Sequence, residues 1–272
     1  MLQNLHTHTL YCDGKNTPRE MIEGALSLGF NSLGFSGHAP TSQSADWETS
    51  KLDLNEYINE IKTLAAEYRN RIKIYLGLEI DRYSVGLVNP RDYEYTIGSV
   101  HMAKRNGEWL DFDHNAEETK KSIESLFDGD ALAYAKLYYE TLAEMPKIID
   151  YDIVGHFDVL TKFSEKHPAL SPIDSSTYKT MALEALSAVR EKKELFEVNT
   201  GAISRGHRTT PYPAPFILRE MKSLGCKLVL TSDCHAVSGI DCAFSEAKEY
   251  IKANGFDTLY YLTDTGFKGE KI

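Results

Sequence analysis

Short β-prone apolar runs recur along this chain, and nearly all of them end in a histidine or a carboxylate. These runs cover residues 32–38, 72–79, 95–101, 151–156 and 227–235. The N-terminal segment adds His6 and His8, which project to one face of an extended strand because residues two apart point to the same side. Histidines without a common role would be scattered over helices and loops, so the pattern predicts that polar side chains converge where strands end.

Helical segments alternate with these runs. Residues Thr17 to Glu20 have the spacing of a capping box with proline at the first helical position, and Gly29 follows where that helix would end. From Leu54 to Tyr68 apolar residues recur on one helical face. Further helices are predicted over 116–127, 131–145, 175–191, 215–224 and 241–254. Further strands are predicted over 194–199 and 258–262, and loops over 81–91 and 104–115, the second of them as a lid.

This alternation of strands with helices of ten or more residues indicates a parallel α/β sheet. With about seven such units and donor residues at the ends of nearly all strands, a closed barrel fits better than a doubly wound sheet, whose ligands gather at one crevice. A chain of 272 residues is long enough for one barrel, so residues 1–272 are predicted to form a single domain.

Composition limits the partners and the compartment. The formal charge of −10 argues against an extended nucleic-acid surface, although a local basic patch could still hold one phosphate. The four cysteines show no C-x-x-C pairing, which favours a reducing compartment. The first residues already read as a strand, and no apolar run approaches the roughly 20 residues of a membrane span. A cytoplasmic protein is therefore expected, and its oligomeric state is not indicated.

The polar groups at the predicted strand ends are suited to metal binding. They are His6, His8, Asp13, His38, Glu79, His101, His156, Asp233 and His235. A zinc site takes three or four protein ligands, so this set implies two or three ions, with Glu79 suited to bridge a pair. Zinc, manganese and iron all accept such mixed ligands. Paired metals supply hydroxide near neutral pH, which favours hydrolysis, most naturally of a phosphate ester.

The motifs H-T-H, G-H, G-L-E, S-V-H, G-H-x-D and S-D-x-H together resemble the polymerase and histidinol phosphatase family along essentially the whole chain. The resemblance implies a distorted (β/α)7 barrel of the TIM type, with a trinuclear centre of divalent transition metals at its C-terminal face. It implies that the first ion is held by His6, His8, Glu79 and Asp233. It implies that the second is held by Glu79, His101 and His156, and the third by Asp13, His38 and His235.

The run from Glu197 to Gly201, followed by Arg205 and His207, resembles the histidinol-phosphatase branch of that family. This resemblance implies a phosphomonoesterase of histidine biosynthesis that hydrolyses L-histidinol phosphate, a small-molecule substrate. Glu79 and Asp233 would then serve in catalysis as well as in metal binding.

Several further residues are candidates for substrate contacts. Arg205 and Arg208 could grip phosphate bidentately, or they could be solvated loop charges. His207 could protonate the leaving alkoxide or donate to phosphate. Asn199 could bond the substrate or cap a loop. The weaker candidates are Lys15, Arg82 and Lys104, whereas His114 and His167 are expected at the surface.

Other functions remain open. Nucleotide phosphatases, exonucleases and phosphotyrosine phosphatases of the same family share the metal ligands, but a nucleic-acid enzyme would need a basic track with aromatic side chains. An amidohydrolase acting on C–N bonds would commonly use a bridging lysine, where this chain has Glu79. A non-catalytic metal-binding regulator would be favoured by lost ligands, and no position of the pattern is missing.

Overall fold

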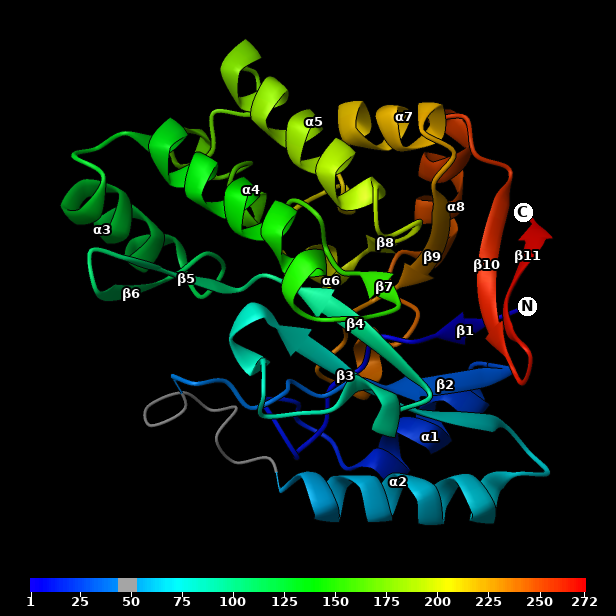
Figure 1. Ribbon diagram of the computed structural model, residues 1–272. Coiled ribbons are helices and arrows are strands. Elements are labelled where there is room, and N and C mark those ends of the chain that lie inside the picture. Colours follow the sequence, from blue (N-terminus) through cyan, green and yellow to red (C-terminus); the bar gives the residue numbers. More distant parts are fainter. Residues whose placement is uncertain (44–52) are drawn as a thin grey trace.

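The computed structural model describes residues 1–43 and 53–272, and its centre is a parallel seven-stranded sheet curled into a nearly closed barrel (Figure 1). The strand order is β1-β2-β3-β4-β7-β8-β9. The strands are β1 (Gln3–Asn4), β2 (Ser32–Phe35), β3 (Lys73–Asp81), β4 (Tyr95–Ser99), β7 (Ile153–Val154), β8 (Leu195–Asn199) and β9 (Lys227–Thr231). The N–H of His8 donates to the carbonyl of Cys234 at 2.9 Å and so joins the first strand to the last. The predicted barrel is confirmed, and the doubly wound alternative is wrong.

Helices surround this barrel. They are α1 (Pro18–Ser27), α2 (Leu54–Tyr68), α3 (Ala116–Leu126), α4 (Ala131–Ile148), α5 (Ser176–Arg190), α6 (Gly201–Ser204), α7 (Pro215–Ser223) and α8 (Phe244–Ala253). Helix α2 lies below β2 and β3, whereas α4, α5 and α7 lie along the opposite side (Figure 1). The capping box predicted before α1 is present, since Thr17 and Glu20 bond each other's backbone N–H. Across the described ranges 1–43 and 53–272, the structure contains no helix with the length and apolarity needed to span a bilayer.

The N-terminal end of the barrel is filled by apolar side chains. Tyr95 lies inside the barrel and donates a hydrogen bond to the carbonyl of Leu5. Gly77 leaves room for this ring, because a Cβ at that position would stand 2.3 Å from it. Below it, the side chain of Gln3 bonds both the N–H and the carbonyl of Leu262, at 2.8 and 3.0 Å. These contacts close one end of the barrel and leave the carboxyl ends of the strands for a site.

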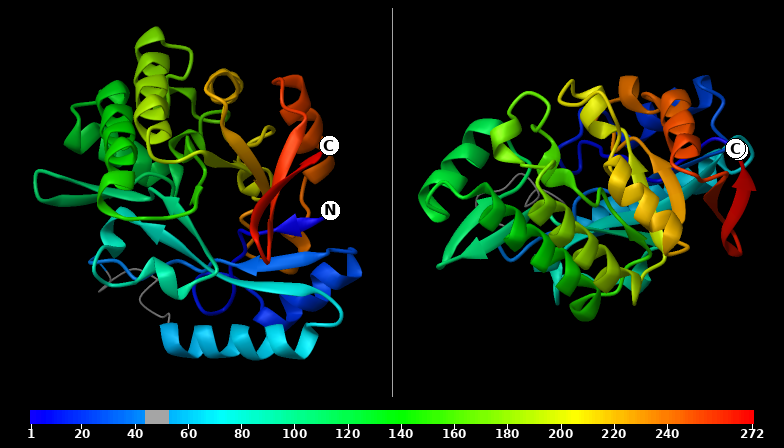
Figure 2. Two further views of the ribbon diagram at one scale, coloured as in Figure 1. Left: turned by 45° about the vertical axis from the view of Figure 1, so that its right-hand side comes forward. Right: turned by 90° about the horizontal axis from the view of Figure 1, so that it is seen from above.

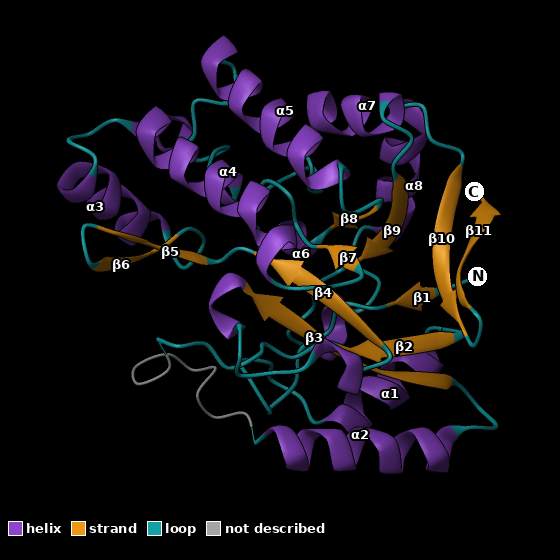
Figure 3. Cartoon of the chain, in the orientation of Figure 1, coloured by secondary structure: helices purple, strands orange, loops and turns teal. Residues whose placement is uncertain are grey.

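Two hairpins differ from the predicted secondary structure. The expected lid loop over 104–115 contains the antiparallel strands β5 (Met102–Arg105) and β6 (Glu108–Asp111), beside α3 (Figure 3). The tight turn between them uses Asn106 and Gly107, both with positive φ. The strand expected at 258–262 is β10 (Thr258–Thr263), but it pairs with β11 (Gly266–Lys271) instead of closing the barrel. The β5–β6 pair and strand β11 were missed because these short strands are largely polar and lack an apolar pattern.

Two helix boundaries also differ from the predicted ones. Helix α8 begins at Phe244 instead of residue 241, because Ala243 adopts a left-handed backbone conformation with φ of 55°. Helix α4 continues to Ile148 although Pro146 removes one backbone donor from its last turn. The two chain termini lie close together beside the β10–β11 hairpin (Figure 2), where the N-terminal amine lies 3.1 Å from Glu270 Oε2.

Candidate metal centre at the strand ends

All nine predicted donor side chains lie at the carboxyl ends of the barrel strands. Six strands or the loops that follow them supply these donors: β1, β2, β3, β4, β7 and β9. They lie at the base of a cavity of about 720 Å³, and most of them line it. Parallel strands bring their carboxyl ends to one face of a barrel, so donors far apart in sequence become neighbours.

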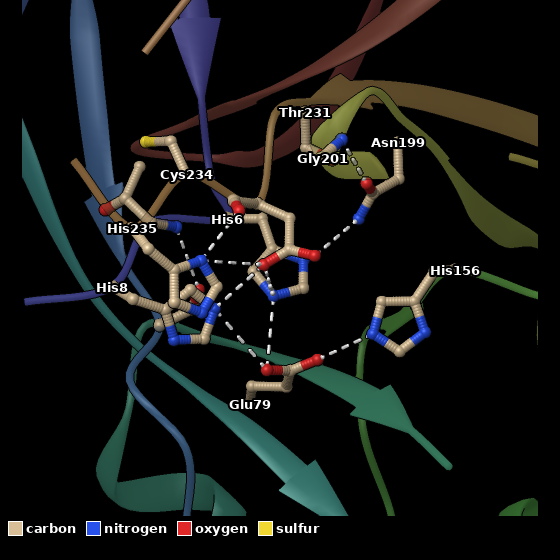
Figure 4. A network of polar contacts seen from close by, with 12 residues as sticks. His6, His8, Glu79, His156, Asn199, Gly201, Thr231, Cys234 and His235 are labelled. Atoms are coloured by element: carbon tan, nitrogen blue, oxygen red, sulfur yellow. Dashed lines mark hydrogen bonds and ion pairs between the residues drawn. The ribbon is translucent and has the colours of Figure 1, made fainter. Parts of the chain in front are cut away.

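The first donor group contains His6, His8, Glu79 and Asp233. Nε2 of His6 lies 3.2 Å from Oε2 of Glu79, and Nε2 of His8 lies 3.1 Å from Oδ1 of Asp233. The other two cross-distances, His8 to Glu79 and His6 to Asp233, are 3.6 and 3.7 Å. Figure 4 shows the His6 and His8 rings and the Glu79 carboxylate turned toward one another.

The second donor group uses the other oxygen of Glu79. Oε1 lies 3.1 Å from Nε2 of His156 and 3.3 Å from Nε2 of His101, and these two nitrogens are 3.2 Å apart. Nδ1 of His38 approaches Oε2 at 3.0 Å. Glu79 therefore stands between two sets of imidazoles, with one oxygen toward each.

The third donor group contains Asp13, His38 and His235, with His8 at its edge. Oδ2 of Asp13 lies 2.8 Å from Nε2 of His235 and 3.7 Å from Nε2 of His38, whereas its Oδ1 lies 3.5 Å from Nδ1 of His8. His8 stacks on His235 with ring centroids 4.2 Å apart. The three groups thus overlap through shared residues.

These groups have the donor types and spacing that bind metal ions. Three sets drawn from these groups each have one donor atom per residue within 4.8 Å of the others: His8, Asp13, His38 and His235; His6, His8 and Glu79; and His38, Glu79 and His101. Two ligands of one tetrahedral ion, each at about 2.0–2.1 Å, are roughly 3.3–3.4 Å apart. Nε2 of His6, Nε2 of His8 and Oε2 of Glu79 are buried and, within the described residues, form no hydrogen bond. A buried polar atom without a partner is costly, and a coordinated ion would satisfy all three.

The crowding of charges shifts the pKa values of these groups in opposite directions. Burial, together with the His235 and His38 rings, lowers the pKa of His8 to about 3. Burial also opposes the charge of His101, but the Glu79 carboxylate raises the pKa of that imidazole to about 10. Burial would raise the pKa of Glu79, yet the surrounding imidazoles hold it well below its usual range. Glu79 is therefore a carboxylate, the form that binds metals.

One wall of the cavity carries charged residues that the sequence did not single out. Asp81 follows Glu79 by two residues on β3, and its Oδ2 accepts a hydrogen bond from the backbone N–H of His101 at 3.0 Å. Asp111 is the last residue of β6 and Asp113 lies just after it, where Nζ of Lys162 bonds Oδ2 of Asp113 at 3.1 Å. Burial and the neighbouring Asp113 raise the pKa of Asp111 to about 7. The sequence signal that could have identified them is the i, i+2 spacing of two acidic pairs, Glu79 and Asp81 on β3 and Asp111 and Asp113 at the end of β6.

Arg205 is the one predicted substrate residue that the structure places at the cavity. Its Nη2 lies 3.1 Å from Oδ2 of Asp233, and its Nη1 donates to the carbonyl of Asp233 at 3.0 Å. The same Nη1 lies 3.1 Å from Nδ1 of His235. The guanidinium therefore holds the segment that carries two predicted ligands, while it also lines the cavity.

Asn199 is fully buried and is not among the described residues that line the cavity. Its Oδ1 accepts the N–H of Gly201 at 2.7 Å, which agrees with the loop-capping alternative. Its Nδ2 lies 3.1 Å from Oε2 of Glu197 and 3.4 Å from Oδ2 of Asp233. The geometry gives Asn199 a supporting role and no substrate contact, because both ends of its amide are already bonded.

The remaining predicted substrate residues are likewise not among the described residues that line the cavity: Lys15, Arg82, Lys104, His207 and Arg208. Arg208 is buried, bonds Thr161 and stacks over Tyr212, and Arg82 pairs with Glu144 at 2.8 Å. The ring of His207 packs against Phe163, and burial lowers its pKa, which disfavours a proton donor. The substrate contacts predicted for these residues therefore have no support in the geometry. His114, expected at the surface, is exposed but also lines the cavity.

Known proteins resemble this chain in sequence and in fold. The family model of the PHP domain matches residues 4–201. A protein of Deinococcus radiodurans described as a probable histidinol-phosphatase is 29% identical over 268 residues, which cover 94% of this chain and 95% of that protein. The histidinol-phosphatase of Bacillus subtilis is 27% identical over 258 residues, which cover 88% of this chain and 95% of that protein.

A solved structure shows the same fold. The histidinol phosphate phosphatase of Lactococcus lactis, crystallised with zinc, L-histidinol and phosphate, superposes with a TM-score of 0.69 and 20% sequence identity. The match covers 98% of both chains.

Proposed function

Because this chain belongs to the PHP domain family, we propose that it is a metal-dependent phosphomonoesterase that hydrolyses L-histidinol phosphate to L-histidinol and phosphate. The observation that carries the proposal is the convergence of nine donor side chains at the carboxyl ends of the barrel strands, where seven of them line one cavity. The relatives named as histidinol-phosphatases match this chain over nearly its full length, which supports this ester over others.

The proposed centre holds three divalent transition ions, zinc, manganese or iron, one at each donor group. Such ions would supply hydroxide near neutral pH and offset the charge on the phosphoryl oxygens. The zinc found with the Lactococcus lactis structure agrees with this choice of metal. The first ion would be held by His6, His8, Glu79 and Asp233, the second by Glu79, His101 and His156, and the third by Asp13, His38 and His235.

The protein's own groups would orient the ester within this centre. Glu79 presents one oxygen to each of the first two donor groups, so it would keep their ions at a constant separation. Arg205 holds Asp233 from the cavity side, where its guanidinium would also bind a non-bridging phosphoryl oxygen. Tyr95, Leu5 and the other apolar residues beneath the site close the opposite end of the barrel.

The competing functions fit less well. An amidohydrolase would commonly place a lysine where Glu79 serves both donor groups. A non-catalytic regulator would not need a complete donor set at a cavity large enough for a substrate. Nucleotide and phosphotyrosine phosphatases share the ligands, so only a comparison of substrates separates them from the proposed enzyme.

We further propose a cytoplasmic protein of one domain, residues 1–272, that acts on a small molecule and not on nucleic acid. The formal charge of −10 supports the last point. All four cysteines are free thiols in the structure, which suits a reducing compartment.

The substrate assignment predicts a clear order of rates. With matched metal loading, kcat/KM for histidinol phosphate should exceed that for nucleoside monophosphates, phosphotyrosine and a short oligonucleotide. Steady-state kinetics on this panel measure the order directly. If a nucleotide or phosphotyrosine is hydrolysed faster, the chain acts as another branch of the family.

Arg205→Met is expected to lower kcat/KM by on the order of 10², the loss typical of one charged transition-state contact in a closed site. Metal content should stay at the wild-type level, because removing a cation beside Asp233 does not weaken the attraction of that carboxylate for metal ions. Inorganic phosphate should inhibit the variant less. Arg205→Lys should recover only part of the rate, since an ammonium lacks the bidentate fork.

Arg82→Met is the matched control, because the same change there removes a partly exposed ion pair with Glu144 away from the cavity. It should retain wild-type kinetics. Wild-type kcat/KM in Arg205→Met would mean that the guanidinium makes no contact with the transition state. A loss of metal in that variant would assign the rate defect to the metal centre.

A further inference from the structure

Beneath the donor groups, one buried carboxylate with no role in the proposed reaction lies at the centre of a hydrogen-bond network. Glu197 lies on β8 and has no exposed surface. Its Oε1 lies 2.6 Å from Nδ1 of His6 and also accepts from the hydroxyl of Thr231. Its Oε2 accepts the backbone N–H of His156 at 2.7 Å and the side-chain amide of Asn199 at 3.1 Å. All four acceptor positions of the carboxylate are therefore used.

The contact with His6 decides which ring nitrogen faces the cavity. An ionised carboxylate only accepts hydrogen bonds, so Nδ1 of His6 carries a proton. The other nitrogen, Nε2, lies 3.2 Å from Oε2 of Glu79 and 3.7 Å from Oδ1 of Asp233. It is buried and forms no hydrogen bond within the described part of the chain. Glu197 thus turns the metal-binding nitrogen of His6 toward the first donor group.

The other oxygen of Glu197 reaches the second donor group. It bonds the backbone N–H of His156, whose Nε2 lies 3.1 Å from Oε1 of Glu79. His6 and His156 approach different oxygens of Glu79 and are both held by Glu197 from below. Figure 4 shows these two histidines reaching different oxygens of the Glu79 carboxylate. One carboxylate therefore links the first donor group to the second.

We propose that Glu197 is a positioning residue that fixes the tautomer and orientation of His6 and ties the first donor group to the second, so that metal affinity depends on its carboxylate. This inference rests on the proposed metal site, but not on which phosphate ester is hydrolysed. Partners that orient metal-binding histidines typically contribute 10- to 100-fold to metal affinity.

Glu197→Gln tests the inference because it keeps the size of the side chain and replaces one acceptor oxygen with a donor. The new NH₂ group must face either His6 and Thr231 or the donors of His156 and Asn199. Competition with a chromophoric chelator measures the zinc affinity, and at least one of the bound zinc ions should have a Kd about 10- to 100-fold higher than in the wild-type protein. Glu194→Gln is the matched control, since Glu194 precedes the same strand, is about half exposed and pairs with Lys227. Unchanged zinc affinity in Glu197→Gln would overturn the inference.

Thr231→Val separates positioning of the ligand from general loosening of the core. It removes one donor to Glu197 but leaves the carboxylate and its contact with His6 in place. Its zinc affinity should fall much less than that of Glu197→Gln, even if both variants unfold at lower temperature. Equal losses of affinity would mean that packing alone is responsible, and the inference would be wrong.

A measurement on the wild-type protein covers the case in which Glu197→Gln does not fold. In the zinc-loaded chain with ¹⁵N-labelled histidine, two-bond correlation spectra should show His6 protonated at Nδ1 and unprotonated at Nε2. A His6 ring protonated at Nε2 would refute the inference. None of these readouts uses a phosphate ester, so a failed substrate assay leaves them valid, and their failure leaves the phosphatase proposal standing.

Discussion

Replacing Glu79 with glutamine is expected to lower kcat/KM by on the order of 10⁴ or more, a loss comparable to removing a central catalytic group. Glu79 is the residue whose two oxygens face different donor groups, at 3.2 Å from His6 and 3.1 Å from His156. Glutamine keeps the shape but removes the negative charge and one acceptor. Both the first and the second ion should bind more weakly, so the metal content measured by elemental analysis should fall together with the rate.

Glu124→Gln is the matched control for that experiment. Glu124 lies on α3 with its side chain 64% exposed and its Oε1 3.8 Å from Nζ of Lys120. The same substitution there should change neither metal content nor rate, because exposed ion pairs contribute little. A Glu79→Gln enzyme that retains full activity would show that this carboxylate does not bridge two ions. A variant that keeps its metal but loses activity would assign Glu79 to catalysis and not to metal binding.

Removal of metal by a chelator is expected to abolish hydrolysis completely, and added zinc, manganese or iron should restore it. Fully active protein should contain more than one equivalent of transition metal. The midpoint temperature of unfolding should also fall on chelation. Ions that bind only the folded chain stabilise it, and the effect grows with their concentration relative to Kd. Calorimetry and elemental analysis of the same samples measure both effects.

The chelation experiment can contradict the proposed centre in two ways. Elemental analysis that finds one equivalent or less in a fully active sample would exclude a multinuclear site. If protein stripped of metal hydrolyses the ester at the same rate, the donor groups serve the structure and not the catalysis. Magnesium added in place of a transition metal is a useful control, since magnesium prefers oxygen ligands and these groups are rich in imidazole.

Much of the fold could be predicted because the relevant signals are local. Apolar runs of strand length, the capping box before α1 and the helical face of α2 each depend on residues within a few positions of one another. The barrel followed from the alternation of these elements. The β5–β6 hairpin could not be predicted in this way, because its four-residue strands carry charged residues and are held by their turn and by packing beside α3.

The convergence of the donor side chains at one end of the barrel could be predicted as well. Which donors contact one another could not be predicted. His6 and Asp233 are 227 positions apart, and the sequence shows only that both follow apolar runs. The resemblance to a family suggested a grouping, whereas the structure adds overlaps, such as His38 reaching both Glu79 and Asp13. Such overlaps depend on side-chain directions, which no spacing rule specifies.

The sequence by itself determined the inventory of this site: nine donors at strand ends, a barrel to bring the ends together, and an arginine in the following loop. Only the tertiary structure decided which side chains face the cavity. It turned Arg205 toward Asp233, buried Asn199 and Arg208, and brought Lys162 to Asp113. The physical reason is that periodicity specifies the face of a strand on which a residue lies, whereas contacts between loops are decided by closure of the barrel, which joins β1 to β9.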